Sequence, residues 1–149
     1  MLRRLCRPLV LAALCFANTC AVASDWVFVA KSEIGEAWVD KSSIAPKGKY
    51  TKAWTIWDYG IPQKLQGIYP PKEYQSTKVL NYYDCAEGTS AIIQSAYYGG
   101  RAGTGENVQS WSYDSTKVLF NDFTPDTVGE TIHKFVCNNS RNKSTNQRP

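Results

Sequence analysis

The stretch YTKAWTIWDY, residues 50–59, decides the fold, because its side chains divide between two faces when the chain is extended. Ala53, Thr55 and Trp57 fall on one face, whereas Trp54 and Ile56 fall on the other. Such a run of β-branched and aromatic residues is typical of a strand. The sequence therefore predicts a long strand here, with apolar side chains on both faces.

Five further segments of the same character flank this strand. Turn signals such as Pro46-Lys47-Gly48 separate them, and they span residues 26–30, 36–40, 78–85, 90–98 and 107–113. The first two are predicted to form a hairpin. Six short strands at this spacing favour an antiparallel meander.

One segment near the C-terminus has the period of a helix instead. Thr127 with Glu130 three residues later is a capping-box pattern. Apolar side chains then recur along one helical face, at Val128, Ile132, Phe135 and Val136. A helix this short needs its apolar stripe docked to be stable, so we expect it to pack on a face of the sheet.

Residues 1–23 have the pattern of a cleavable signal peptide. Basic residues precede a short apolar run at 9–16, and Ala21-Val22-Ala23 provides the small residues before the cleavage point. Cleavage is expected after Ala23 or, as second choice, after Ser24. The residues before Cys15 and Cys20 fit a lipobox poorly, so a lipid anchor is not expected. The apolar run is also shorter than the roughly 20 residues that span a bilayer.

Two of the five cysteines, Cys85 and Cys137, follow this leader. An even pair in a chain sent to an oxidising compartment is expected to form a disulfide. Closing a loop of about 52 residues stabilises a fold by roughly 4 kcal/mol in the chain-entropy model. The predicted fold is thus α+β: a six-stranded antiparallel sheet with one C-terminal helix packed on it and tied by this disulfide. Residues 24–137 form the domain, and the polar residues 138–149 are predicted to be a disordered tail.

The charge of the mature domain excludes two classes of partner. Three of the 17 basic residues and none of the 13 acidic residues lie in the leader, which leaves 14 and 13, or a net charge near +1. Such a small charge does not indicate binding to nucleic acid or to an anionic membrane surface. No transmembrane segment is predicted in the mature protein either.

Two loops stand out in this scheme. Residues 60–75 contain three prolines and form a long connection, which could be a binding loop or an inert crossover between non-adjacent strands. The glycine-rich stretch Gly99–Gly105 could suggest a phosphate loop, but no helix follows it. We therefore predict a hairpin or bulge there, with residues at positive φ.

The sequence holds little that points to catalysis. His133 is the single histidine, predicted to lie off the apolar stripe, and no motif ties it to a nucleophile or a carboxylate. One histidine and an oxidised cysteine pair are too few ligands for zinc. The carboxylates are scattered. We therefore expect no enzyme activity, no cofactor and no metal.

The aromatic residues are expected to serve mainly as core, because a small sheet needs large side chains to bury enough area. The face opposite the helix is expected to expose some of Trp57, Tyr59, Tyr82, Tyr97 and Trp111. Trp and Tyr are favoured at protein interfaces. The candidate partner-binding residues are Trp57, Tyr59, Tyr69, Tyr74, Lys47, Lys49 and Lys52.

Short motifs follow one another in order along nearly the whole mature chain. They are WVF at 26–28, GEAWVD at 35–40, AWTIWDY at 53–59, PQ at 62–63, STK at 76–78, DC at 84–85, YG at 98–99 and PDTVGE at 125–130, followed by Cys137. This series resembles the bacterial surface-adhesin protein E-like domain family. The resemblance implies the same sheet with its disulfide-tied helix, and a surface protein that binds host matrix or serum proteins such as vitronectin and laminin. The three lysines near residue 50 are the nearest match to a basic patch.

Taken together, these features predict an exported, non-enzymatic binding protein of a Gram-negative bacterium, located in the periplasm or at the outer cell surface. The alternative is a periplasmic envelope protein that inhibits or stabilises another protein and has no host ligand. The sequence leaves the oligomeric state and the identity of the partner open.

Overall fold

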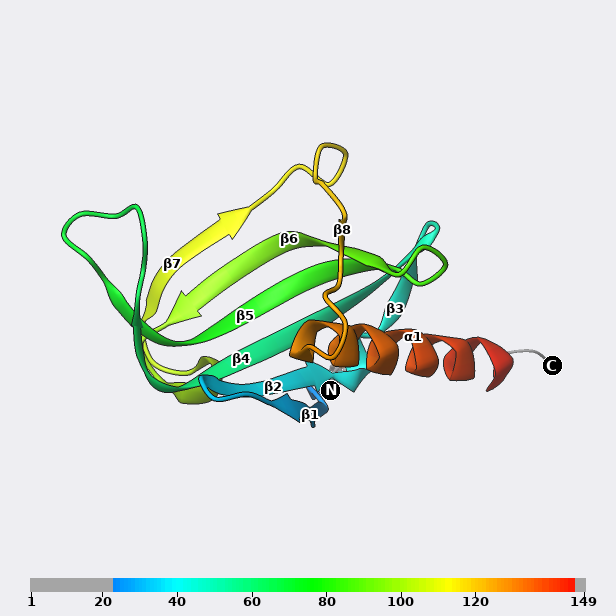
Figure 1. Cartoon of the computed structure of the whole chain (residues 1–149), viewed down its shortest axis with the longest axis horizontal. Coiled ribbons are helices and arrows are strands. Elements are labelled where there is room, and N and C mark those ends of the chain that lie inside the picture. The colour runs from blue at the N-terminus through cyan, green and yellow to red at the C-terminus, as the bar shows by residue number, and fades with distance from the viewer. Residues whose placement is uncertain (1–22, 147–149) are drawn as a thin grey trace, which may run out of the picture.

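A computed structural model describes the backbone of residues 23–146 and the side chains of residues 23–142 (Figure 1). All but the last residue of the predicted signal peptide, 1–23, therefore lies outside the described residues. Among the described residues, no helix combines the length and apolarity needed to cross a membrane.

One twisted antiparallel sheet forms the body of the molecule. Its main strands lie in the order β1-β2-β4-β5-β6-β7, each paired with its neighbour in that order. Their bounds are β1 Trp26–Lys31, β2 Gly35–Asp40, β4 Tyr50–Lys64, β5 Glu73–Asp84, β6 Thr89–Tyr98 and β7 Asn107–Ser112. The predicted six-stranded meander is thus confirmed. Two short strands were not predicted: β3, Ala45–Lys47, pairs with β4, and β8, Asn121–Asp122, pairs with β6.

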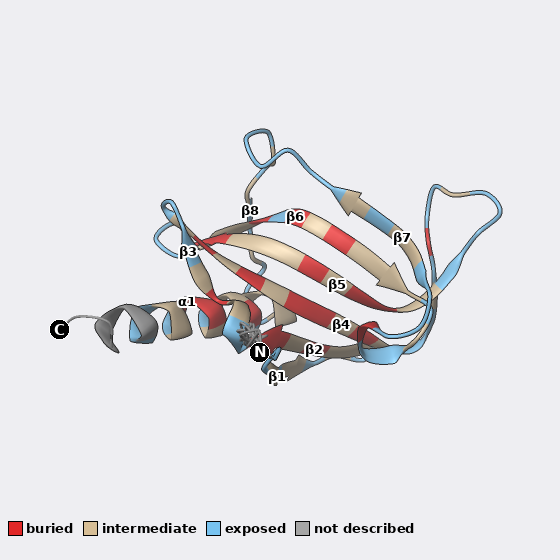
Figure 2. Cartoon of the chain, turned by 180° about the vertical axis from the view of Figure 1, so that it is seen from behind, coloured by how far each residue is buried: buried red, intermediate tan, exposed pale blue. Residues whose placement is uncertain are grey.

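The central strand β4 buries residues on both faces, as its sequence pattern predicts. Thr51, Ala53 and Thr55 are buried on the face that carries the helix, and Ile56 is buried on the other. On the helix-bearing side, Thr55 lies opposite Val79 of β5 and Val39 of β2. Figure 2 shows the buried segments on β2, β4, β5 and β6 and on the turns of α1 beside the sheet.

The helix α1, Val128–Asn146, packs against β1, β2, β4 and β5 (Figure 1). Its buried side chains Ile132 and Val136 join the main core cluster, which also contains Ala37, Val39, Ala53 and Tyr83 of the sheet and Ile44 just before β3. The predicted disulfide is present between Cys85, just after β5, and Cys137 on α1, with the two Cα atoms 5.6 Å apart. The disulfide therefore fastens the terminal helix to the centre of the sheet.

The start of α1 follows the predicted capping pattern with one change. The Glu130 amide donates to Thr127 Oγ1 at 3.3 Å, as a capping box requires. The Glu130 carboxylate accepts from the Asp126 amide at 3.1 Å, rather than from the amide of the capping residue itself. Both bonds satisfy amides that precede or open the helix and have no partner within it.

Two expectations about connections are wrong. Residues 60–75 are not a crossover between non-adjacent strands, because β4 and β5 are neighbours and extend into both ends of this segment to form a long hairpin with a loop of residues 65–72. Nor is the chain disordered from Asn138, because α1 continues to Asn146. Bonds from polar side chains hold this part of the helix: Asn139 Nδ2 donates to the Phe135 carbonyl at 2.8 Å, and Ser140 Oγ lies 3.1 Å from Thr51 Oγ1 of β4. Residues 147–149 lie outside the described part of the chain.

Candidate functional site

Four aromatic side chains form a continuous row across four neighbouring strands. We name Tyr59 of β4, Tyr74 of β5, Tyr97 of β6 and Trp111 of β7 the aromatic row. Successive ring centroids are 5.6, 4.8 and 5.0 Å apart, and the ring planes meet at 85°, 90° and 85°. Edge-to-face pairs of this kind are worth about 0.5–1.5 kcal/mol each beyond the area they bury. The rings therefore hold one another in fixed positions while each stays half-buried.

Strand register places this row on the same face as α1. Trp57 lies opposite Thr77, which lies opposite Tyr97, and paired residues share a face of the sheet. Trp57 itself packs against the core cluster that contains the helix. The expectation that aromatic residues lie opposite the helix is therefore wrong for Trp57, Tyr59, Tyr97 and Trp111. Tyr82 does lie on the face opposite the helix, because it pairs with Lys52, whose side chain points away from the face that carries Ala53 and Trp57.

Two hydroxyl groups of the row, those of Tyr74 and Tyr97, have raised pKa values. Burial, followed by the neighbouring Tyr59, raises the pKa of Tyr74 to about 12. Burial also raises the pKa of Tyr97. Tyr74 and Tyr97 thus stay neutral at any physiological pH, and each can donate a hydrogen bond to a partner.

The β4–β5 hairpin extends from the end of the sheet at which the row lies. Tyr69 at its tip is 94% exposed and Ile61 on its β4 side is 69% exposed. The hairpin is nevertheless anchored: Leu65 is buried and its amide donates to the Lys72 carbonyl at 2.8 Å. Lys72 Nζ donates to the Val108 carbonyl of β7 at 3.1 Å. The hairpin therefore presents an apolar tip on an ordered base.

The three candidate lysines lie at the opposite end of β4. Lys47 pairs with Tyr50 at the start of that strand, nine residues before Tyr59, which corresponds to about 30 Å along a strand. Lys49 Nζ is 3.1 Å from Asp84 Oδ2 and 4.9 Å from the centre of the Tyr50 ring. Its hydrogen bond to Asp84 raises the pKa of Lys49. The structure thus brings Trp57, Tyr59 and Tyr74 together, puts Tyr69 on the adjoining hairpin, and leaves the lysines apart.

The glycine-rich loop between β6 and β7 is a structural hairpin, as predicted. Ala102 and Gly103 have φ of +52° and +70°, within a short helical turn at Arg101–Gly103. Arg101 Nη2 donates to Asp58 Oδ2 at 3.1 Å, and the Ala102 amide donates to Asp58 Oδ1 at 3.2 Å. These bonds fold the loop onto the helix-free face. There it borders a cavity of about 200 Å³ lined by Trp26, Trp38, Ile56, Asp58 and Ala102.

A separate apolar surface lies at the connection between β7 and β8. It forms a groove of about 420 Å³ beside β6, with Ile92 and Tyr113 in its lining. Leu119 on its rim is 81% exposed. This surface lies outside the aromatic row and provides a control for it.

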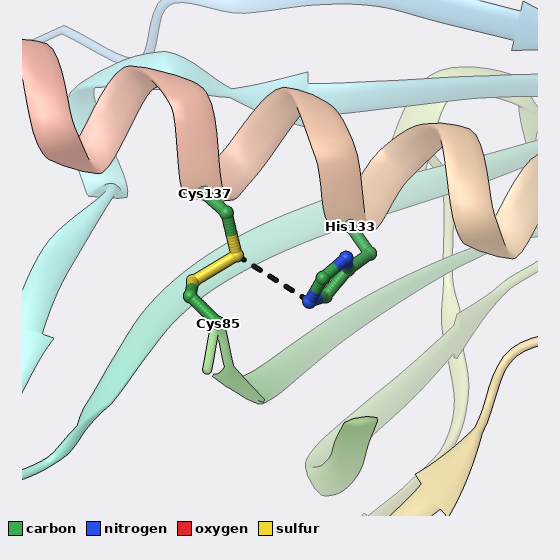
Figure 3. A group of neighbouring side chains, drawn as sticks. All are labelled: Cys85, His133 and Cys137. Atoms are coloured by element: carbon green, nitrogen blue, oxygen red, sulfur yellow. Dashed lines mark hydrogen bonds between the residues drawn. A yellow bond between two sulfur atoms is a disulfide. The ribbon is translucent and has the colours of Figure 1, made fainter. Parts of the chain in front are cut away.

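His133 lies beside the disulfide rather than away from the apolar stripe, so that part of the sequence analysis is wrong (Figure 3). Its Nε2 is 3.5 Å from Cys137 Sγ. Its ring centre is 5.0 Å from that of Phe123 and 6.1 Å from that of Tyr83. The half-buried imidazole therefore fills the space between the helix, β5 and the segment after β8.

Sequence reasoning grouped Tyr59, Tyr97 and Trp111 among the aromatic residues that one face could expose. It left Tyr97 and Trp111 out of the candidate partner-binding residues. Tyr59 and Tyr74 could have been paired from the hairpin between them. The positions of Tyr97 and Trp111 depend on register, and each of the β4–β5, β5–β6 and β6–β7 pairings contains an irregularity. A one-residue shift moves a side chain to the other face, so the row could not be assembled from spacing alone.

Comparisons with known proteins agree with this architecture. Crystal form II of Haemophilus influenzae protein E matches with a TM-score of 0.56 and 18% identity, over 81% of this chain and 93% of that one. A second structure of that protein matches with a TM-score of 0.54 and 18% identity, over 80% and 88% of the two chains. At this identity the likeness shows a common fold. No curated protein sequence gives a significant match. The family described as surface-adhesin protein E matches residues 26–138, most of the chain, so the protein belongs to the surface-adhesin protein E family.

Proposed function

We propose that the protein is an exported adhesin-like binding protein that holds a protein partner on the aromatic row and the adjoining β4–β5 hairpin. The observation that carries this proposal is the row itself, four mutually packed aromatic rings that cross the sheet next to a hairpin whose Tyr69 is 94% exposed. Family membership supports an adhesin-like role.

The physical case rests on preorganisation. Aromatic side chains dominate the energetics of protein interfaces when they sit in well-packed positions. Here each ring is already fixed by its neighbours, so a partner does not have to order them when it binds. Tyr69 at the hairpin tip and Ile61 on its β4 side add apolar area on an anchored base. A flat protein surface that covers both the row and the tip is the partner that fits this shape best.

The proposed partner is a host matrix or serum protein, with vitronectin and laminin as the first candidates to test. We further propose that residues 1–23 direct export and that the mature domain reaches the outer cell surface. Protease treatment of intact cells tests the location: a surface protein is cleaved, whereas one confined to the periplasm is protected. Confinement to the periplasm would favour an envelope protein that inhibits or stabilises another protein.

Replacing single aromatic residues tests the binding surface. Tyr69→Ala and Tyr74→Ala are expected to weaken binding to immobilised matrix protein, and an interface hot spot costs at least about 2 kcal/mol, or roughly 30-fold in Kd. Leu119→Ala removes an exposed apolar side chain outside the surface and should leave Kd unchanged. Biolayer interferometry with vitronectin and laminin provides the measurement. If wild type and the three variants all bind with equal affinity, the binding surface lies elsewhere on the protein.

A further inference from the structure

Three side chains with metal-binding chemistry meet where α1 is fastened to the sheet. Cys85 follows β5, whereas His133 and Cys137 lie one turn apart on the helix (Figure 3). Their candidate ligand atoms all lie within 4.8 Å of one another. In the oxidised protein the two sulfurs are bonded to each other, so they do not supply the thiolates that a metal requires.

We propose that reduction of this disulfide by a dithiol opens a Zn²⁺ site whose protein ligands are Cys85, Cys137 and His133. The metal then replaces the disulfide as the link between α1 and the sheet. The helix thus keeps its covalent or coordinate attachment in both redox states, and zinc affinity depends on the redox state.

Two of the three ligands already have the required spacing. With Zn–S and Zn–N distances of about 2.3 and 2.1 Å and a tetrahedral angle, the sulfur and nitrogen lie about 3.6 Å apart. The observed distance between Cys137 Sγ and His133 Nε2 is 3.5 Å. The rings of Phe123 and Tyr83 pack against the imidazole and fix its orientation. The helix therefore presents a preformed pair of ligands at positions i and i+4.

The third ligand has room to move into place. Two sulfurs on one tetrahedral Zn²⁺ lie about 3.8 Å apart, so they must separate by roughly 2 Å after the S–S bond breaks. Cys85 is exposed and begins the turn between β5 and β6, whereas Cys137 is only 3% exposed. Cys85 is thus the sulfur that moves. Its exposed side leaves the fourth coordination position to water, as in other zinc sites with three protein ligands.

The redox step balances with the dithiol as reductant. One thiolate of the dithiol attacks Sγ of Cys85, the more exposed of the two residues, the S–S bond breaks, and Cys137 leaves as a thiolate. The second sulfur of the reductant then displaces Cys85, and the reductant departs as a cyclic disulfide after giving two electrons to the protein. When both protein sulfurs bind Zn²⁺ as thiolates, the two thiol protons pass to solvent.

Cobalt binding tests the site directly. The protein is reduced with a dithiol, freed of the reductant under nitrogen, and titrated with Co²⁺ as a coloured substitute for Zn²⁺. One equivalent should give sulfur-to-cobalt charge-transfer bands and tetrahedral d–d bands that added Zn²⁺ abolishes, whereas the oxidised protein should give neither. His133→Ala should weaken binding at least about tenfold, and Lys134→Ala, the next residue on the helix with an exposed side chain, should not.

Thermal unfolding of the reduced protein provides an independent readout. Zn²⁺ should raise the Tm of the reduced protein and leave that of the oxidised protein unchanged, because a ligand stabilises the form that binds it. The proposal is overturned if the reduced protein lacks the charge-transfer bands, or if His133→Ala binds Co²⁺ as tightly as wild type. A reduced protein that stays unfolded both with and without Zn²⁺ also overturns it.

Discussion

Asp84 holds together the turn that leads from β5 into the disulfide. Its Oδ1 accepts from the amides of Ala86 and Glu87, both at 3.2 Å, and its Oδ2 lies 3.1 Å from Lys49 Nζ. The hydrogen bond from the Glu87 amide is the main cause that lowers the pKa of Asp84, and burial opposes it. The hydrogen bonds and the ion pair of Asp84 therefore fix the start of the turn that carries Cys85, the next residue in the chain.

This lowered pKa predicts a pH-dependent stability. A carboxylate whose folded-state pKa lies below the unfolded value of about 3.9 stabilises the fold fully above that value. The contribution is lost as the pH falls through the lowered folded-state pKa. The difference in free energy of unfolding between wild type and Asp84→Asn should therefore be largest near neutral pH and shrink below about pH 3.9. Denaturant unfolding across this range measures it; Asp122→Asn, an exposed carboxylate on β8, is the control. A difference that is constant with pH would contradict the assignment.

Gly35 lies where the backbones of β2 and β4 come close together. A Cβ at this position would collide with the backbone carbonyl oxygen of Asp58, which cannot move without disturbing the strand pairing. Gly35→Ala is therefore expected to cost about 1–3 kcal/mol, the usual range for overpacking. Gly60, at the matching edge of the same region, has open space around it, so Gly60→Ala should cost far less. Thermal unfolding distinguishes them, and equal costs would show that the two strands can separate at no penalty.

At the scale of elements, α1 depends on two kinds of attachment. Ile132 and Val136 bury its apolar stripe in the core, while Cys137 forms the disulfide to Cys85. The helix continues past this bond to Asn146, although its later residues are polar. The apolar periodicity of the sequence predicted the first part of α1, which packs on the sheet. The continuation of α1 past Cys137 could not be predicted, because polar contacts such as that of Ser140 with Thr51 hold it.

Removing the disulfide should lower stability without changing the fold. The double variant Cys85→Ser/Cys137→Ser loses the cross-link over 52 residues, so its free energy of unfolding should fall by about 4 kcal/mol. Guanidinium unfolding followed by circular dichroism provides the value. The matched control is reduced wild type in metal-free buffer, which should resemble the double variant. A loss below about 1 kcal/mol would mean that core packing alone holds the helix.

At the scale of the whole molecule, strand periodicity predicted the order of the sheet from β1 to β7. It missed the long β4–β5 hairpin because Gly60 and Pro62 are usual turn residues. In the structure they fall where the pairing is irregular between Asp58 and Gln63, and proline is tolerated at such a place. Similar irregularities in the β5–β6 and β6–β7 pairings meant that the register of β6 and β7 could not be predicted. The aromatic row depends on that register, so it could not be predicted either. The elements could thus be predicted, whereas the surface made by several strands together could not.

One covalent bond, between Cys137 of the terminal helix and Cys85 at the end of β5, is the feature on which the other conclusions depend. Peptide mapping of unreduced protein recovered from the cells that produce it tests this directly. Mass spectrometry is expected to find the peptides that contain Cys85 and Cys137 joined as one cross-linked pair. Recovery of both cysteines alkylated without prior reduction would contradict the account.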